Sequence, residues 1–149
     1  MGTDLQLQLN ELLTSLYSDI RDVEEKALIK DDFADITYND MHVIEAIGTE
    51  EPKNSSFVAK KLHVTMGTLT KSIDGLVNKG YVRRERSDSD KRKVLLSLLD
   101  KGISAYNHHA RFHKDMVTSV LSQLNTDEDA AVLQKMLGGL SGYFKTMKE

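Results

Sequence analysis

The chain contains no cysteine among its 149 residues, and this absence excludes several classes of protein. Disulfide bonds, thiolate zinc sites, iron–sulfur clusters and thiol-based redox sensing all require cysteine. The chain also lacks an apolar run of the roughly 20 residues that a bilayer span requires, and its first residues do not form a secretion signal. We therefore expect a cytoplasmic protein that has no membrane partner.

Proline and aromatic residues are also scarce: Pro52 is the one proline, and aromatic residues make up 6% of the chain. Hydrophobic residues make up 40%, which suffices for one core and, with so few turn-forming residues, favours a helix-rich globular fold. We expect a single domain over residues 1–149. Because no nucleophile elbow, phosphate-binding glycine loop or metalloprotease helix is present, we do not expect an enzyme.

The net charge of −3 hides an uneven distribution. Residues 60–101 carry eleven Lys and Arg against five Asp and Glu, whereas the remainder carries nine against eighteen. Attraction to phosphate depends on the local field within about 10 Å at ordinary salt, so the basic middle can supply it. A solvated basic surface without a partner is the alternative interpretation.

Apolar residues recur at three- and four-residue spacing over most of the chain, which predicts amphipathic helices. The predicted helices cover residues 5–28, 37–47, 54–62, 65–77, 100–124 and 126–147. Two β-prone runs, residues 81–86 and 93–98, flank a polar loop and predict a hairpin. The fold class is mainly α with a small β wing, and the two short helices before the hairpin form a helix-turn-helix.

The helix after Thr65 and the following wing carry the residues that we expect to contact DNA. Thr68, Lys71 and Ser72 are spaced to face away from the buried stripe, so they can meet base edges and phosphates in the major groove. Arg92 at the wing tip can enter the minor groove, and Asp90 can hold either Arg86 or Arg92 by paired hydrogen bonds. The expected DNA-binding set is Thr65, Thr68, Lys71, Ser72, Arg86, Asp90, Lys91 and Arg92.

The pattern resembles the MarR family of winged-helix regulators. The residues that carry the resemblance are Leu76-x-x-Lys79-Gly80-Tyr81-Val82-x-Arg84, Asp90-Lys91-Arg92, Leu96-x-Leu98 and Lys101-Gly102. The resemblance implies a winged helix-turn-helix over residues 37–99, with dimerisation helices over residues 4–30 and 100–148. It also implies a homodimer, because members of the family pair two subunits through their terminal helices.

Within that family, the chain is most similar to the repressors of fatty-acid synthesis in Gram-positive cocci. The matching residues are Val23-Glu24-Glu25, Met41-His42-x-Ile44, Val64-Thr65-Met66-Gly67-Thr68 and Arg111-Phe112-His113-Lys114-x-Met116-Val117. This resemblance implies a repressor whose co-repressor is long-chain acyl-acyl carrier protein. The acyl chain would need an apolar pocket, for which the expected lining is Val23, Met41, Ile44, Ile47 and Phe112; the alternative is that these residues simply fill the core.

A zinc-responsive repressor is the alternative. His109 and His113 are four residues apart and share a helix face, and His42 and Glu24 lie on helices that can pack against them. Related zinc-responsive regulators use a similar arrangement of one glutamate and three histidines. Hydrogen bonding within a polar seam between helices would explain the same residues without a metal ion.

The expected function is sequence-specific binding of double-stranded DNA with no required cofactor, the effector being either acyl-acyl carrier protein or Zn²⁺. A two-fold symmetric dimer predicts a pseudo-palindromic operator with half-sites about 10 base pairs apart. A winged-helix module that binds protein and not DNA is a further alternative. Steep loss of affinity with rising salt distinguishes a DNA reader from such a module.

Overall fold

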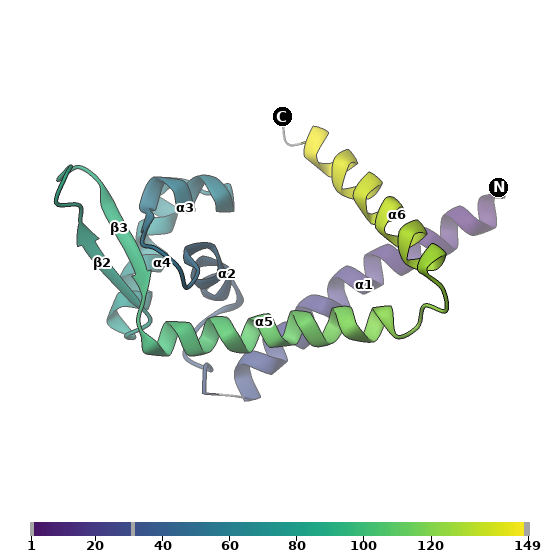
Figure 1. Cartoon of the computed structure of the whole chain (residues 1–149), viewed down its shortest axis with the longest axis horizontal. Coiled ribbons are helices and arrows are strands. Elements are labelled where there is room, and N and C mark those ends of the chain that lie inside the picture. The colour runs from purple at the N-terminus through teal and green to yellow at the C-terminus, as the bar shows by residue number, and fades with distance from the viewer. Residues whose placement is uncertain (1, 31, 148–149) are drawn as a thin grey trace. The chain divides into compact units, whose positions relative to one another are not determined.

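The computed structural model in Figure 1 shows helices joined by short turns, with a small sheet that includes the hairpin after the fourth helix. It describes residues 2–30 and 32–147. The elements are α1 Thr3–Lys30, α2 Tyr38–Ile47, β1 Lys53–Asn54, α3 Ser55–Leu62, α4 Met66–Asn78, β2 Val82–Arg86, β3 Val94–Leu98, α5 Asp100–Leu121 and α6 Asp127–Thr146. The predicted mainly α fold with a β wing is confirmed. Within the described ranges, no helix is both long enough and apolar enough to cross a membrane.

Polar caps determine where several helices begin. The Thr37 side chain accepts a hydrogen bond from the Asp40 amide at 3.1 Å, and the Asp40 carboxylate accepts one from the Thr37 amide at 3.0 Å. Thr126 and Asp129 repeat this reciprocal arrangement before α6. Each pair satisfies amides that the first helical turn leaves without an intrahelical acceptor, so both predicted helix starts are confirmed.

The sheet has the order β1-β3-β2 with all pairs antiparallel. The wing strands pair from Val82 opposite Leu98 to Arg86 opposite Val94, which confirms the predicted hairpin. The two residues of β1 pair with Leu95 and Leu96. The sequence did not predict β1, because a strand of two residues has no alternating pattern to detect.

The chain divides into two compact units, Met1–Ala110 and Arg111–Glu149, and the boundary falls inside α5. The first unit contains the buried hydrophobic core of the described residues, with α2, α3, α4 and the sheet contributing to it. Its most deeply buried large side chains are Tyr81, Met41, Ile44, Ile47, Leu69, Ile73, Leu76, Leu96, Val58 and Val82. The core therefore fixes α4 and the wing on one scaffold.

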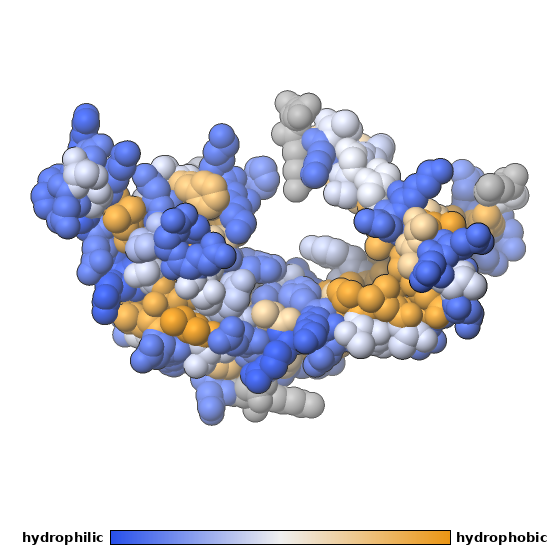
Figure 2. Space-filling model, viewed as in Figure 1, coloured by the Kyte–Doolittle hydropathy of each residue, from blue (hydrophilic) through white to orange (hydrophobic). Residues whose placement is uncertain are grey.

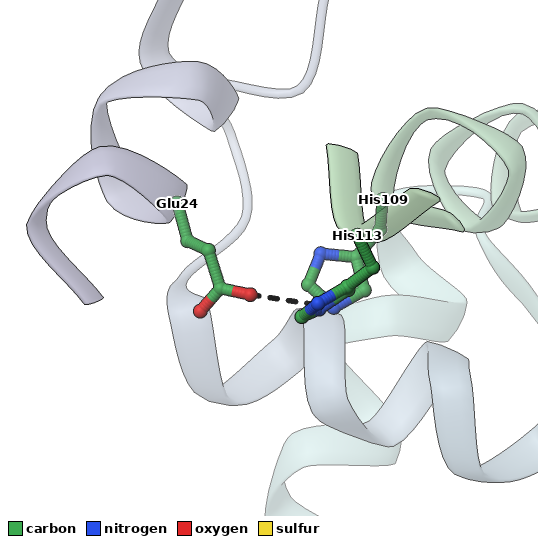
Figure 3. Close-up of side chains that lie close together, drawn as sticks. All are labelled: Glu24, His109 and His113. Atoms are coloured by element: carbon green, nitrogen blue, oxygen red, sulfur yellow. Dashed lines mark ion pairs between the residues drawn. The ribbon is translucent and has the colours of Figure 1, made fainter. Parts of the chain in front are cut away.

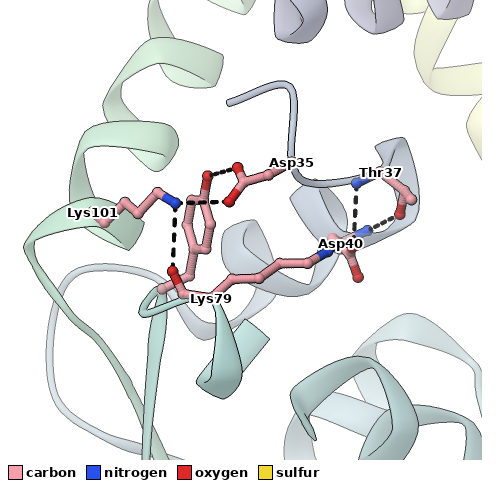
Figure 4. A network of polar contacts seen from close by, with 6 residues as sticks. Asp35, Thr37, Asp40, Lys79 and Lys101 are labelled. Carbon is pink, nitrogen blue, oxygen red and sulfur yellow. Dashed lines mark hydrogen bonds and ion pairs between the residues drawn. The ribbon is translucent and has the colours of Figure 1, made fainter. Parts of the chain in front are cut away.

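A polar network ties the start of α5 to the turn before β2 (Figure 4). Lys101 Nζ donates to Asp35 at 2.7 Å and to the Lys79 carbonyl at 3.4 Å, and the Tyr81 hydroxyl donates to the other Asp35 oxygen. Burial, followed by this bond to Asp35, raises the pKa of Tyr81 to about 12. The Lys101 bond, followed by the Tyr81 bond, lowers the pKa of Asp35.

The close approach of α5 to the backbone of Tyr81 explains the glycine of the Lys101-Gly102 pair. A Cβ atom at this position would lie 2.2 Å from the Tyr81 carbonyl oxygen and 3.3 Å from the Leu98 Cβ atom. Since the oxygen belongs to the backbone, a side chain here would force α5 away from the wing. The glycine thus allows the close approach that the polar network then holds.

Many apolar side chains of the terminal helices are exposed in the single chain, although the sequence pattern predicted amphipathic helices with one buried face. The first helix was expected to bury one stripe, yet most of its apolar side chains are exposed and Leu28 is buried. Helix α6 has no buried residue. Apolar side chains of these helices that remain exposed are Leu5, Leu7, Leu9, Leu12, Leu13, Leu16, Val23, Val132, Met136, Leu137 and Phe144, and such surface is orange in Figure 2. The predicted segment boundaries at residues 1, 148 and 149 lie outside the described residues.

Candidate nucleic-acid interface

Helix α4 is held by its apolar face and presents the other face to solvent. Leu69, Ile73 and Leu76 are at most 2% exposed, at the three- and four-residue spacing that predicted a single stripe. Thr65 is the N-cap, and its hydroxyl accepts from the Thr68 amide at 3.2 Å. The predicted cap is confirmed, and the first turn of α4 is fixed by side chains of its own segment.

The four residues predicted to contact DNA from this segment do not share one environment. Thr65, Thr68 and Lys71 are exposed, whereas Ser72 is partly buried. Thr65 and Thr68 also join their hydroxyls at 3.0 Å, so each has a partner within the chain. Ser72, next to the buried Ile73, lies at the edge of the apolar face of α4.

The loop at the wing tip, residues 87–93, is organised by backbone bonds and by Asp90. The Ser87 amide donates to the Lys93 carbonyl, and the Lys93 amide donates to the Asp90 carbonyl, at 3.0 and 2.9 Å. Asp90 Oδ1 accepts from the Arg92 amide at 3.1 Å and from Arg92 Nε at 3.4 Å. Figure 2 shows this tip as hydrophilic surface.

These contacts decide which arginine Asp90 holds. Arg92 is its partner, while the Arg86 guanidinium donates to the Lys91 carbonyl at 3.3 Å. The Arg92 side chain is 93% exposed even with this contact, and Lys91 is paired with Asp88 at 3.6 Å. The wing tip therefore presents a guanidinium oriented at its base and free at its end, as minor-groove insertion requires.

An ion pair between the wing and α4 was not assigned a role from the sequence. Arg84 on β2 donates to Asp74 on the exposed side of α4. In the sequence, Arg84 belongs to the family motif. Nothing in the sequence pattern indicates that Arg84 contacts Asp74. This pair joins the two elements that are expected to contact neighbouring parts of a duplex.

Two hollows flank α4. One of about 440 Å³ lies between α4 and the sheet and has Met66, Leu69, Ile73, Arg84, Arg86 and Leu96 in its lining. The other, of about 330 Å³, has Asn39, His42 and Val43 from α2 and Leu62, Val64, Thr68, Leu69 and Ser72 from the helix-turn-helix. The second hollow thus borders both α2 and α4.

The predicted histidine and glutamate residues lie partly together in the first unit. Buried Glu24 faces His109, with Oε1 and Nε2 3.9 Å apart (Figure 3). The His42 and His109 ring centroids are 6.1 Å apart. His113 is on the next turn of α5 and belongs to the second unit.

Glu45 is a further acidic residue of this cluster that sequence reasoning missed. Its Oε2 lies 3.4 Å from His42 Nδ1 and 3.7 Å from His109 Nε2. The hydrogen bond with His109 is the main cause that lowers the pKa of Glu45 to about 2. The available signal was the i,i+3 spacing of His42 and Glu45, which places both side chains on one side of α2.

The residues predicted to line an apolar pocket are in different environments. Met41, Ile44 and Ile47 are fully buried in the core, with at most 1% of each exposed. Val23 on α1 is 50% exposed. Phe112 lies in the second unit, partly buried, with its ring 5.5 Å from that of His113.

Comparison with known proteins identifies a family match over the segment that contains α4 and the wing tip. The model of the MarR family matches residues 36–94, which contain the helix-turn-helix and most of the wing. Among curated proteins, the HTH-type transcriptional regulator PchR of Bacillus subtilis is 28% identical over 114 residues, covering 73% of this chain and 68% of PchR. The HTH-type transcriptional regulator SarZ of Staphylococcus haemolyticus is 34% identical over 95 residues, covering 64% and 65%. The chain thus spans about two thirds of these relatives.

A solved structure matches nearly the whole chain. It is that of Streptococcus pneumoniae FabT in complex with DNA, 37% identical, with a TM-score of 0.89 and coverage of 95% of this chain and 99% of that one. Since these relatives are transcriptional regulators, the prediction of a regulator in preference to an enzyme is confirmed. The likeness extends beyond the helix-turn-helix and the wing to the terminal helices.

Proposed function

Since the chain belongs to the MarR family and is a DNA-binding transcriptional regulator, we propose that it represses fatty-acid biosynthesis genes, with long-chain acyl-acyl carrier protein as co-repressor. The observation that carries the proposal is the likeness to Streptococcus pneumoniae FabT over 95% of the chain. The motifs shared with the repressors of fatty-acid synthesis in Gram-positive cocci agree with it. The carrier, an acidic protein, would dock on basic residues.

We propose that α4 reads the major groove and that the wing tip reaches the minor groove. Thr68 and Lys71 are exposed on the side of α4 that faces away from the core, and Arg92 projects from the wing tip. Thr65, Ser72, Arg86, Asp90 and Lys91 complete the proposed DNA-contact set or hold it in place. Direct contacts to base edges supply specificity, and contacts to phosphates supply affinity.

A homodimer is part of the proposal. Both α1 and α6 carry exposed apolar side chains, and a second copy of the chain would bury them. Two reading helices related by a two-fold axis require a pseudo-palindromic operator with half-sites about one helical turn apart.

For the acyl chain, we propose the region around α2. Met41, Ile44 and Ile47 are closed off in the core, so the accessible space is the 330 Å³ hollow beside α2 and α4, whose lining includes the apolar Val43, Leu62 and Val64. A ligand there touches the reading helix directly. It would tighten DNA binding only through a higher affinity for the DNA-competent arrangement.

A zinc-responsive repressor is a second candidate, favoured by the cluster of His42, Glu45 and His109. One ligand atom from each of the three lies within 4.8 Å of the others. Tetrahedral zinc with nitrogen and oxygen ligands places neighbouring ligand atoms roughly 3.4 Å apart, close to the separations of Glu45 from the two imidazoles. Zinc bound there would join α2 to the part of α5 that belongs to the first unit, near the predicted ligand Glu24.

One mobility-shift series distinguishes the two candidates. Wild-type protein is titrated against the duplex that it enriches from a random pool, with long-chain acyl-acyl carrier protein, with Zn²⁺, and with neither. Enhancement by the acyl carrier alone supports the fatty-acid proposal. Enhancement by Zn²⁺ alone contradicts it in favour of metal regulation, and His42→Ala should then abolish the zinc effect.

A further inference from the structure

Gly67 occupies the centre of the exposed face of α4 in its first turn. It is the second residue of the helix, and it lies four residues before Lys71, so the two positions share one side. At about 100° per residue, this side is opposite that of the buried Leu69 and Ile73. In helix-turn-helix proteins, the N-terminal residues of the reading helix meet the base edges.

Nothing within the described part of the chain requires a glycine here. A Cβ atom at Gly67 would have the Thr65 hydroxyl as its nearest neighbour, at 4.0 Å, which is ordinary van der Waals contact. Gly102 is the opposite case, since a Cβ atom there would collide with backbone. Packing therefore explains Gly102 and does not explain Gly67.

Backbone conformation does not explain Gly67 either. Positive φ values among the described glycines are those of Gly48 and Gly80, so the backbone at Gly67 is one that any residue adopts. The cap of α4 is the Thr65 hydroxyl, which acts independently of the residue at 67. Glycine also lowers helix stability relative to alanine, so its presence has a cost that the fold does not recover.

We propose that Gly67 is a specificity-determining residue: its missing side chain lets the first turn of α4 approach the base edges closely enough for its neighbours to read them. The neighbours in question are Thr68 and Lys71, both exposed. Glycine is the residue that permits close approach of a backbone to a ligand. The proposal rests on DNA binding by α4, and it assigns to Gly67 a role that depends on the duplex and not on the fold.

The same helix supplies a matched control in Gly75. A Cβ atom at Gly75 has nothing within 4 Å, so Gly75→Ala adds the same methyl group to the same helix without a clash. Gly75 lies two turns further along, away from the end that meets the bases. Both substitutions should raise the melting temperature slightly, because alanine is the better helix former.

The test measures melting temperature and two affinities for the wild type, Gly67→Ala, Gly67→Leu and Gly75→Ala. The probes are the duplex that the wild type enriches from a random pool and a shuffled duplex of the same composition. We expect Gly67→Ala to lose roughly tenfold in affinity for the enriched duplex, the scale of one well-placed base contact, and Gly67→Leu to lose more. Affinity for the shuffled duplex should stay within about twofold, since no charge changes.

Enriched-duplex affinity of Gly67→Ala equal to that of Gly75→Ala would overturn the proposal. A fall in the melting temperature of Gly67→Ala would also overturn it, because the chain itself would then need the glycine. If the wild type enriches no duplex at all, DNA binding by α4 fails, and that result is distinguishable because it appears before any substitution is made.

Discussion

At the scale of single residues, Arg92 combines high exposure with a fixed base. Its amide and Nε atom both bind Asp90 Oδ1, yet 93% of the side chain is exposed. Arginine inserted into a narrow minor groove meets strong negative potential, and a bound cation there also releases counterions.

Arg92→Ala should therefore weaken binding to the enriched duplex by about 1–3 kcal/mol and lower the slope of log affinity against log salt by about one. Fluorescence anisotropy at several salt concentrations measures both. Lys135→Ala, which removes another exposed positive charge, from α6, is the matched control and should bind like the wild type. Equal affinities for the two variants would remove the wing tip from the DNA interface.

Asp35 gives a prediction for pH. The hydrogen bond from Lys101, followed by that from Tyr81, lowers the pKa of Asp35 below its ordinary value of 3.8. Its stabilising effect is therefore fully present above about pH 4 and is lost as pH falls through the lowered pKa. Because the side chain is 43% exposed, we expect Asp35→Asn to lower the free energy of unfolding at pH 7 by only about 1 kcal/mol.

Urea unfolding at pH 7 and at pH about 3 measures this contribution. The difference between wild type and Asp35→Asn should shrink at the lower pH. A difference that grows on acidification would show that Asp35 does not hold this network as an ionised carboxylate.

At the scale of elements, the structure couples α4 to the wing. Arg84 and Asp74 join β2 to α4 through exposed side chains, 41% and 51% of which are accessible. Exposed ion pairs contribute about 0–1 kcal/mol to stability, so we expect this pair to affect the orientation of the wing more than the stability of the fold. Removal of the pair would leave the shared core to hold α4 and the wing together and would loosen only the orientation of their exposed faces.

Asp74→Ala and Arg84→Ala should each weaken binding to the enriched duplex several-fold, by roughly 1 kcal/mol, while changing the free energy of unfolding by less than that. Asp74 is the sharper test, since its loss removes a negative charge and would otherwise strengthen DNA binding. A double-mutant cycle in DNA affinity measures the coupling. Additive effects of the two substitutions would contradict a joint orienting role.

The elements themselves were largely predictable from the sequence. Helix starts at Thr37, Thr65 and Thr126 follow from capping chemistry that is local in sequence, and the wing strands follow from β-prone runs. The two residues of β1 were not predictable, since they are strand only because β3 lies beside them. From the sequence, either Arg86 or Arg92 could be the partner of Asp90. The loop conformation selects Arg92.

The candidate ligand sites were less predictable, because they depend on contacts between elements that are distant in the sequence. Glu45 joins the histidine cluster because the fold brings His109 of α5 within 3.7 Å of it, and helical periodicity does not encode which helices meet. The sequence pattern also does not separate a core residue from a pocket residue, since both have the same helical spacing. This applies to Met41, Ile44 and Ile47, which are buried in the core.

At the scale of the whole molecule, the terminal helices expose apolar side chains that we expect a second copy of the chain to cover. Met136 and Leu137 on α6 are 62% and 56% exposed. Met136→Glu would place a charge inside a homodimer interface, so we expect a monomer at micromolar concentration and a large loss of operator affinity. Sedimentation measures the first effect, with Gln134→Glu on the same helix as the control. A stable Met136→Glu dimer would mean that this face of α6 lies outside the interface.

The central claim is that α4 and the wing bind a specific duplex, in a chain whose net charge is −3. The most direct measurement is the affinity of the wild type for the enriched and the shuffled duplex between about 50 and 200 mM salt. If the contact set is complete, affinity for both should fall by about 10³-fold or more over this range, and the enriched duplex should remain at least about 10³-fold tighter. Affinity that is independent of salt, or equal for the two duplexes, would contradict the account.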